Sequence, residues 1–255
     1  MSSHATRLAA RVVVVVVVLG CASGASAQQT ANDVIDKSIA ALGGRAAHAK
    51  LQSRAATGTI AITTPAGDIA GTVELLNAAP NKTRVLIKAD LSALGAGELT
   101  LDQRFDGTTG FVLDSLQGNR EITGNQLDNM KNSSFPHPFL NYKEMGTSAQ
   151  LVGKENVGGR DAYVILFDPT AGSEVRNYID AETLLPIKSV MKATVPQLGQ
   201  DIEQTTEFFD YKDVDGVKIP FRIKTSSSIQ SITITLSKVE HNVKVDETLF
   251  AKPGR

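Results

Sequence analysis

The residues that could carry acid–base or metal chemistry are few and widely spaced. The histidines are His4, His48, His137 and His241, and none stands in an HExxH or HxH pattern that would bring two rings to one metal ion. His137 lies between two prolines, and His241 follows the last long apolar alternation. The spacing therefore predicts that the histidines do not converge and that the chain has no metal site.

Nucleophile and phosphate-binding motifs are also missing from the sequence. It contains no GxSxG, SxxK, P-loop or GxGxxG pattern. The acid pairs Glu203 with Glu207 and Asp213 with Asp215 are typical of solvated strand faces and turns. We expect no catalytic residues, no cofactor and a non-enzymatic protein, with a hydrolase assembled from distant residues as the alternative.

The N-terminal residues have the three regions of a signal peptide. Arg7 and Arg11 precede seven consecutive valines and then the small-residue tract GCASGASAQQ. The apolar run is far shorter than the roughly 20 residues of a membrane-spanning helix. We expect residues 1–27 to be removed after Ala27, which leaves residues 28–255 as a single periplasmic domain with no transmembrane segment. Lipidation at Cys21 is the alternative, because Val18 to Cys21 resembles a lipoprotein box.

Composition limits the partners of the mature chain. Cys21 is the only cysteine, so the mature chain can form no internal disulfide. Removal of Arg7 and Arg11 from the 26 basic residues leaves 24 against 27 acidic residues, a net charge of about −3. With no basic patch in the sequence, we expect no nucleic-acid partner.

Helical spacing is confined to the beginning of the mature chain. In TANDVIDKSIAALGGRAAHAKL, Ile35, Ile39 and Leu42 recur at helical intervals. Asn32 or Asp33 is the expected N-cap, and the double glycine after Leu42 ends the helix. A short second helix should follow, to about residue 51.

From residue 53 onward the apolar period changes to two. Turn signals separate the apolar alternations, and the clearest runs from Val217 to Leu236. We expect about ten or eleven antiparallel strands, each with one wet face, in a mainly β sandwich or barrel. Two hairpins share one device, NYIDAETLLPIKSV and FFDYKDVDGVKIPFRI, in which an Asp caps a turn and Gly216 is free to take positive φ.

One segment, Gly124 to Gly146, breaks this rhythm. It has no strand period, carries two prolines, and still holds large apolar side chains, among them Met130, Phe135, Phe139, Leu140, Tyr142 and Met145. A long insert of this composition is not expected to lie free in water. We expect it to pack onto or into the sheet.

The order of several stretches resembles a known family. DVIDKSIAALGG, GTVELLNAAPNKTRVLI, RFDGTTGFVL, VGGRDAYVILFDPTAGSEVRNYIDAETLLPIKSV and HNVKVDETLFAKP are similar to segments of the periplasmic lipoprotein carriers of the LolA and LolB type and of their outer-membrane lipoprotein-sorting relatives. The resemblance covers nearly the whole mature chain. It implies a curved, unclosed antiparallel half-barrel, with an N-terminal helix and a helical or irregular plug on its concave face.

The resemblance also implies a ligand. The partner would be an acyl chain or the lipid anchor of a lipoprotein, and the function would be trafficking for outer-membrane biogenesis. An envelope adaptor or sensor module that binds a partner protein through the same groove is the alternative. The apolar residues are either core only or the lining of a cavity under a movable lid, for which Met and Phe are suited. The expected lining and lid residues are Ile60, Ile62, Val73, Leu75, Val85, Ile87, Met130, Phe135, Phe139, Leu140, Phe221, Ile223 and Ile234.

Overall fold

The computed structural model describes residues 29–92, 95–195 and 200–252. The expected signal peptide and Cys21 lie outside these residues. Within them, no helix is long and apolar enough to cross a membrane.

The described chain forms one antiparallel sheet of thirteen strands in the order β6-β5-β4-β3-β2-β1-β13-β12-β11-β10-β9-β8-β7. The strands are β1 Ser53–Thr64, β2 Gly67–Ala78, β3 Lys82–Asp90, β4 Glu98–Phe105, β5 Gly110–Asp114, β6 Arg120–Ile122, β7 Ser148–Val157, β8 Arg160–Asp168, β9 Val175–Asp180, β10 Pro186–Val195, β11 Gln200–Val214, β12 Val217–Ser226 and β13 Ser231–His241. The expected count of ten or eleven was too low, because strands as short as β5 and β6 hold too few residues to show an alternation.

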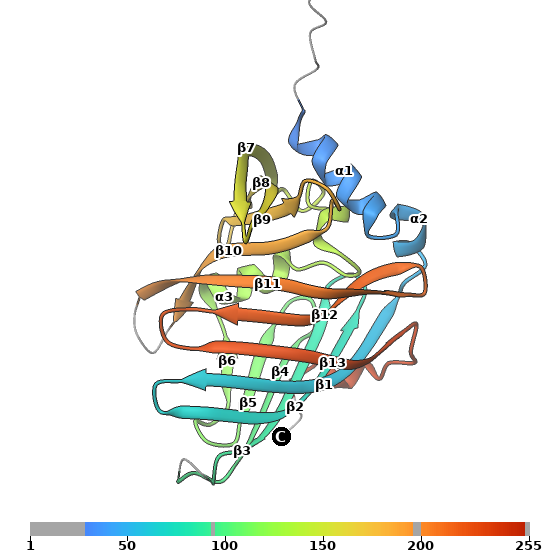
Figure 1. Ribbon diagram of the computed structural model, residues 1–255. Coiled ribbons are helices and arrows are strands. Elements are labelled where there is room, and N and C mark those ends of the chain that lie inside the picture. Colours follow the sequence, from blue (N-terminus) through green and yellow to red (C-terminus); the bar gives the residue numbers. More distant parts are fainter. Residues whose placement is uncertain (1–28, 93–94, 196–199, 253–255) are drawn as a thin grey trace, which may run out of the picture.

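The strand order explains why the sheet is a half-barrel. The first strand pairs with the last in the middle of the sheet; the chain builds outward from β1 to the edge strand β6, and then inward from the opposite edge strand β7 to β13. The two edges, β6 and β7, are consecutive in sequence but are not hydrogen-bonded to each other. The segment between them must therefore pass from one edge to the other, and it does so inside the curve of the sheet (Figure 1). The predicted curved, unclosed antiparallel sheet is confirmed.

Two short helices precede the sheet, α1 Ala31–Ala41 and α2 Arg45–His48. The N-cap of α1 is Thr30, so the expected caps Asn32 and Asp33 were wrong. Thr30 Oγ1 accepts a hydrogen bond from Asp33 N–H at 3.2 Å, and Asp33 Oδ2 accepts one from Thr30 N–H at 2.9 Å. This reciprocal capping box places Asp33 at the third helical position, where its carboxylate reaches back to the cap.

The predicted plug contains α3 Gly124–Asn132 and a 3₁₀ turn, η2 Pro138–Leu140. Its side chains enter three hydrophobic clusters. Phe139 and Tyr142 pack with α1 and β8, Phe135 packs with Phe221 of β12, and Met130 packs with strands β4 to β6. The insert is therefore a buried part of the core on the concave side, as its composition predicted.

Both copies of the repeated turn adopt the expected chemistry. Gly216 has φ +81°, and its N–H donates to Asp213 Oδ1 at 3.0 Å. Asp180 Oδ1 accepts from Thr183 N–H at 2.7 Å in the other copy. The copies also meet, because Tyr211 O–H donates to the Pro186 carbonyl at 2.8 Å. The device is used twice to fix two neighbouring hairpins against each other.

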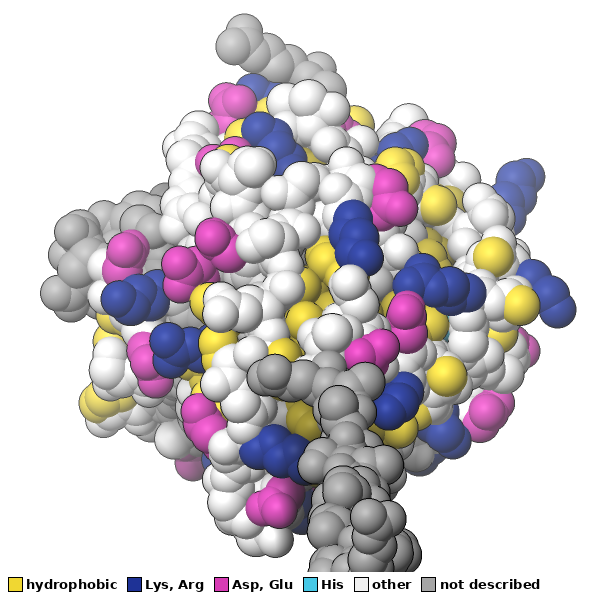
Figure 2. Space-filling model, turned by 90° about the horizontal axis from the view of Figure 1, so that it is seen from above, with side chains coloured by type: hydrophobic (Ala, Val, Ile, Leu, Met, Phe, Trp, Pro, Cys, Tyr) yellow, Lys and Arg dark blue, Asp and Glu magenta, His cyan; other side chains and the backbone are white. Residues whose placement is uncertain are grey.

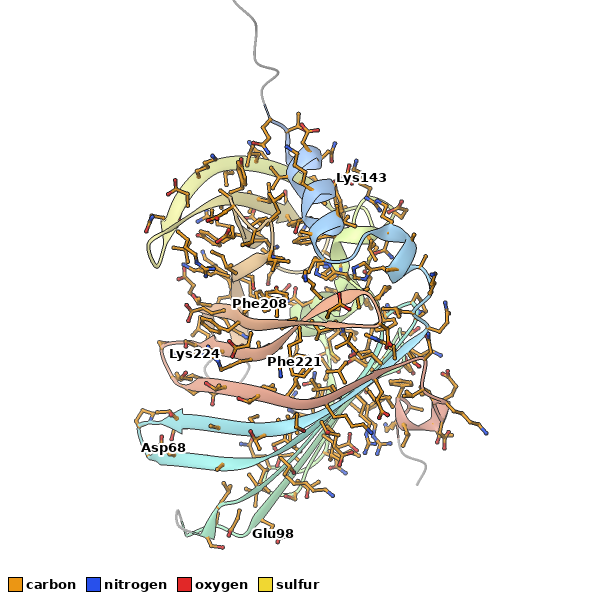
Figure 3. The ribbon with its side chains drawn as sticks, turned by 45° about the vertical axis from the view of Figure 1, so that its right-hand side comes forward. Asp68, Glu98, Lys143, Phe208, Phe221 and Lys224 are labelled. Atoms are coloured by element: carbon orange, nitrogen blue, oxygen red, sulfur yellow. The ribbon has the colours of Figure 1, made fainter. Side chains whose placement is uncertain are left out.

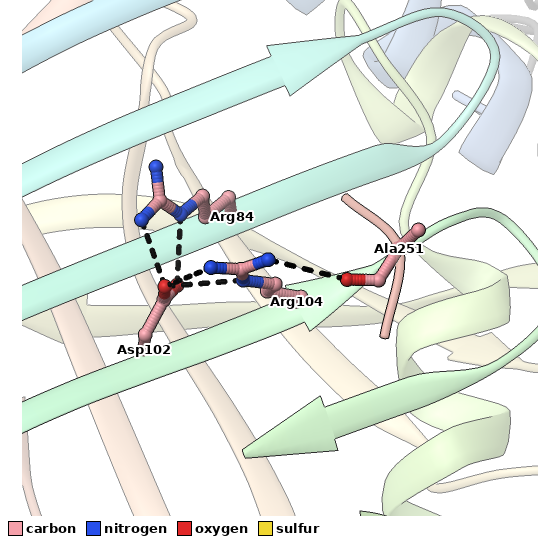
Figure 4. Close-up of polar contacts among 4 residues, drawn as sticks. All are labelled: Arg84, Asp102, Arg104 and Ala251. Atoms are coloured by element: carbon pink, nitrogen blue, oxygen red, sulfur yellow. Dashed lines mark hydrogen bonds and ion pairs between the residues drawn. The ribbon is translucent and has the colours of Figure 1, made fainter. Parts of the chain in front are cut away.

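The C-terminal segment is held on the convex face by an ion-pair network (Figure 4). Asp102 accepts a bidentate pair from Arg84 at 2.8 and 2.7 Å, and Arg104 donates to the same carboxylate at 2.7 Å. Arg104 Nη1 also donates to the Ala251 carbonyl at 3.4 Å. Arg84, Asp102 and Arg104 alternate along β3 and β4 with residues of the concave side, so the network ties the end of the chain to the outside of the sheet.

A candidate ligand cavity of two chambers

The larger chamber lies between the plug and the strands β8 to β11 and has a volume of about 720 Å³. Met130 of α3, Phe139 of η2, Phe167 of β8, Met191 of β10 and Phe208 of β11 contribute its apolar walls. Its polar walls are neutral amides and hydroxyls, and no Asp, Glu, Lys or Arg lines it among the described residues. An uncharged, largely apolar lining is suited to an apolar or neutral ligand.

A polar latch holds α3 against the strands on the far side of this chamber. Asn129 Oδ1 accepts from Ser173 N–H at 2.7 Å, and Ser173 O–H donates to the Lys192 carbonyl at 2.6 Å. Asn132 Nδ2 donates to the Ala171 carbonyl at 2.7 Å. Gly172 is required between them, because a Cβ there would lie 2.7 Å from Asn129 Oδ1 and its φ is +99°. The latch connects the plug to the loop between β8 and β9 and to β10, and so covers one side of the chamber.

The smaller chamber has a volume of about 330 Å³ and lies next to the larger one under α2 and the β11–β12 hairpin. The two chambers share five lining residues: Ser133, Pro138, Phe139, Asn177 and Phe208. His48, Arg54, His137 and Lys218 line only the smaller chamber, and none of its described lining residues is acidic. The cavity therefore has a neutral part and a basic part.

The two histidines of the smaller chamber are uncharged near neutral pH. Burial lowers the pKa of His48, and the positive charge of Arg54 lowers it further. Burial also lowers the pKa of His137 to about 3, with smaller contributions from His48 and Arg54. Consistent with a neutral ring, His137 Nδ1 accepts a hydrogen bond from Phe139 N–H at 3.2 Å. Arg54 remains charged, although burial lowers its pKa to about 10.

The expectation that the histidines do not converge was wrong. The rings of His48 and His137 lie 6.1 Å apart between centroids, and His241 is the strand partner of Arg54. These residues come from α2, β1, the plug and β13, so no short-range spacing could show their convergence. No group of three His, Cys, Asp or Glu in the described part of the chain could hold a metal ion.

Of the residues expected to line a cavity, Met130 and Phe139 do so. Phe135 and Phe221 are buried together near α2, and Leu140 packs against the cluster below α1. The strand residues lie on the concave face in register, as in Ile60 opposite Ile234 and Ile234 opposite Ile223; the others are Ile62, Val73, Leu75, Val85 and Ile87. None of these strand residues lines either chamber.

Sequence reasoning missed several walls of the chambers, among them Phe208, Met191 and Arg54. Phe208 lies directly opposite Ile223 in the sheet, so correct pairing of β11 with β12 would have placed it on the concave face. Figure 3 shows Phe208 and Phe221 between the end of the molecule that carries Lys143 and the end that carries Asp68 and Glu98. The chambers lie toward the Lys143 end, where the plug and the helices meet the sheet.

Several solved structures share this fold. A LolA superfamily protein from Nitrosomonas europaea has a TM-score of 0.56 at 14% identity, over 88% of this chain and 98% of that chain. A DUF1329 family protein from Desulfovibrio piger has a TM-score of 0.56 at 14% identity, over 87% and 97%. A domain from Vibrio parahaemolyticus assigned to outer membrane lipoprotein sorting has a TM-score of 0.55 at 14% identity, over 86% and 94%.

No family model and no curated protein matches the sequence. The structural likeness confirms the predicted resemblance to the lipoprotein-sorting half-barrels at the level of the fold.

Proposed function

We propose that the protein is a non-enzymatic periplasmic protein that binds an acyl chain, either of a free lipid or of a lipoprotein anchor, in the larger chamber. The observation that carries the proposal is the uncharged lining of that chamber. Charged side chains in its wall would have to lose water or find partners when hydrocarbon enters, and that cost is absent here.

The size and composition of the chamber support the same ligand. Its volume of about 720 Å³ falls within the ~300–1,000 Å³ of ordinary small-molecule sites. Met130 and Met191 can adapt their shape to a flexible chain, and Phe139, Phe167 and Phe208 supply rigid apolar area. On the face seen in Figure 2, charges of both signs are interspersed on the outside of the molecule, in contrast to the chamber lining.

The fold gives the proposal its cellular setting. One of the structures with this fold is a domain assigned to outer membrane lipoprotein sorting. Together with the expected signal peptide, this supports a role in moving lipids or lipoproteins through the envelope. A ligand would enter where this latch separates, because its hydrogen bonds hold α3 against the loop between β8 and β9.

Native mass spectrometry of protein purified from its own envelope tests the proposal, together with displacement of a fluorescent fatty acid. We expect a bound mass that organic extraction removes, and saturable uptake of the probe. Met191→Arg, which places a charge in the chamber wall, should abolish uptake. Leu116→Arg, at a side chain that is 49% exposed, is the control and should have no effect.

A reproducible ligand-free mass with no probe uptake would overturn the proposal. A protein partner recovered at equal stoichiometry with an empty chamber would favour the adaptor function instead.

A further inference from the structure

The smaller chamber contains a cation that no described residue of the chain neutralises. Arg54 lies in β1, and no carboxylate of the described residues comes within ion-pair distance of it. Its one hydrogen bond is long, from Nη2 to Asn77 Oδ1 at 3.5 Å, and its Cζ lies 5.5 Å from the centroid of the Phe135 ring. Most of the five N–H donors of this guanidinium have no protein acceptor.

Arg54 differs in this respect from the other half-buried arginines of the described chain. Arg84 and Arg104 share Asp102, and Arg222 Nε donates to Asp210 Oδ2 at 2.8 Å. Burial of a cation without a partner is unfavourable, so an arginine at such a position is unusual unless a ligand completes it. The pairing elsewhere in the sheet shows that this chain otherwise follows the rule.

A second group in the same chamber also has no partner. His48 is 3% exposed and lines the chamber, and neither of its ring nitrogens has a hydrogen-bond partner. The backbone of Leu42 is near enough to His48 to oppose part of the lowering of its pKa, but it does not meet hydrogen-bond geometry with the ring. Buried polar atoms are rarely left unpaired in folded proteins. Both nitrogens are also closed off from the open part of the chamber, so a ligand oxygen reaches one of them only if the ring turns.

The remaining lining sets the sign of that ligand. No acidic residue among the described ones lines the chamber, so the charge of Arg54 is not opposed within its wall. The planar fork of an arginine matches a carboxylate or a phosphate, because two parallel N–H groups can donate to two oxygens. The smaller chamber thus has the donors for an anion, and it adjoins a chamber suited to hydrocarbon.

We propose that the smaller chamber binds the anionic head group, a carboxylate or a phosphate monoester, of a single-chain lipid whose acyl chain occupies the larger chamber. Arg54 is the counter-ion, and its guanidinium donates hydrogen bonds to the head-group oxygens. The shared wall at Phe139 and Phe208 is where the chain passes from one chamber to the other. This inference rests on the proposed function and names the class of lipid.

Four probes test it by displacement of a fluorescent fatty acid: palmitic acid, hexadecyl phosphate, hexadecanol and inorganic phosphate. We expect the two anionic lipids to bind at least about tenfold more tightly than the alcohol, because charge-assisted hydrogen bonds are the stronger kind. Arg54→Met should remove this preference and leave the affinity for hexadecanol unchanged. Arg120→Met, which removes an exposed arginine of β6, should change none of the affinities.

Thermal unfolding of the ligand-free variants provides an independent readout. Because Arg54 has no carboxylate partner, Arg54→Met should melt at the same temperature as the wild type or above it. A merely structural role for Arg54 would instead lower the melting temperature and weaken all the lipids equally.

The outcomes separate this inference from the function on which it rests. Equal affinity for palmitic acid and hexadecanol, with no effect of Arg54→Met, would overturn the head-group site and leave acyl binding intact. Inorganic phosphate that binds as tightly as hexadecyl phosphate would show a site for a free anion and would also overturn the proposal. Failure of all three chain-bearing probes would overturn the proposed function itself.

Discussion

Replacement of Phe139 by alanine tests whether the plug is part of the folding core. Phe139 is 3% exposed and stacks on Phe167 at 5.2 Å between ring centroids, with the planes 10° apart. The His137 ring lies 4.7 Å from it between centroids, in a T-shaped arrangement with the planes 75° apart. Truncation of a fully buried phenylalanine costs ~3–5 kcal/mol of folding free energy. We expect about 3 kcal/mol here, the lower end, because one side of Phe139 already borders the two chambers and has fewer packed neighbours.

Urea-induced and thermal unfolding, followed by circular dichroism, measure this loss. For a chain of this size, about 3 kcal/mol corresponds to a fall in Tm of roughly 6–12 °C. Phe209→Ala is the matched control, because Phe209 is the next residue of β11 beyond the chamber wall and pairs with Arg222, whose Cζ lies 4.2 Å from its ring. It should cost about 1 kcal/mol, the value of an exposed cation–π contact.

The result that would refute this reasoning is a loss below about 1 kcal/mol for Phe139→Ala with a clear change in acyl-probe affinity. Elements that open readily contribute little to global stability. That outcome would make Phe139 part of the movable cover expected from the sequence, rather than of the core in which the structure places it.

Three further substitutions test the turn, the latch and the ion-pair network. Gly216→Val should lower the free energy of unfolding by about 1 kcal/mol or more, because a β-branched residue resists a φ of +81°. Gly216→Asn should be tolerated, and an unchanged Tm for the valine variant would contradict the positive φ assigned to this turn. Asn129→Ala removes the acceptor of Ser173 N–H and should lower the free energy of unfolding by about 1–2 kcal/mol. Relative to the wild type, hydrogen exchange should speed up more in α3 than in β12, and an equal increase in both would argue against a latch. Asp102→Asn should cost about 2 kcal/mol at neutral pH by urea unfolding. Burial alone would raise the pKa of Asp102, but the two arginines lower it below 3.8. The stability that the Asp102 carboxylate contributes is therefore present above pH 3.8 and is lost as the pH falls through the lower pKa of the folded state. The unfolding free energies of the wild type and of Asp102→Asn should therefore converge in acid. A difference that stays constant as the pH falls below 3.8 would refute the stabilising role of the Asp102 ion pairs.

The sequence by itself determined the elements of this protein. The change of apolar period at residue 53 marked the transition from helix to strand. Side chains return to the same face every 3.6 residues in a helix and every 2 residues in a strand, so one apolar pattern cannot serve both elements. Turn chemistry fixed the positive φ of Gly216, and the apolar residues of the insert required its burial. These features depend on residues close together in the chain. The strand count and the N-cap Thr30 were missed because β6 is three residues long and because several polar residues at the start of α1 could have served as the cap.

Only the tertiary structure decided the candidate site. Arg54 and His241 are brought together by the pairing of the first strand with the last, and His48 and His137 meet because the plug crosses the concave side below α2. The register of β11 with β12 turned Phe208 inward. The contacts of Arg54 with His241 and of His48 with His137 join segments far apart in the chain and depend on how the curved sheet wraps around its insert, and the inward position of Phe208 depends on the register of a hairpin. Local periodicity carries no information about such distances, so the basic and neutral chambers could be recognised only once the sheet was folded around the plug.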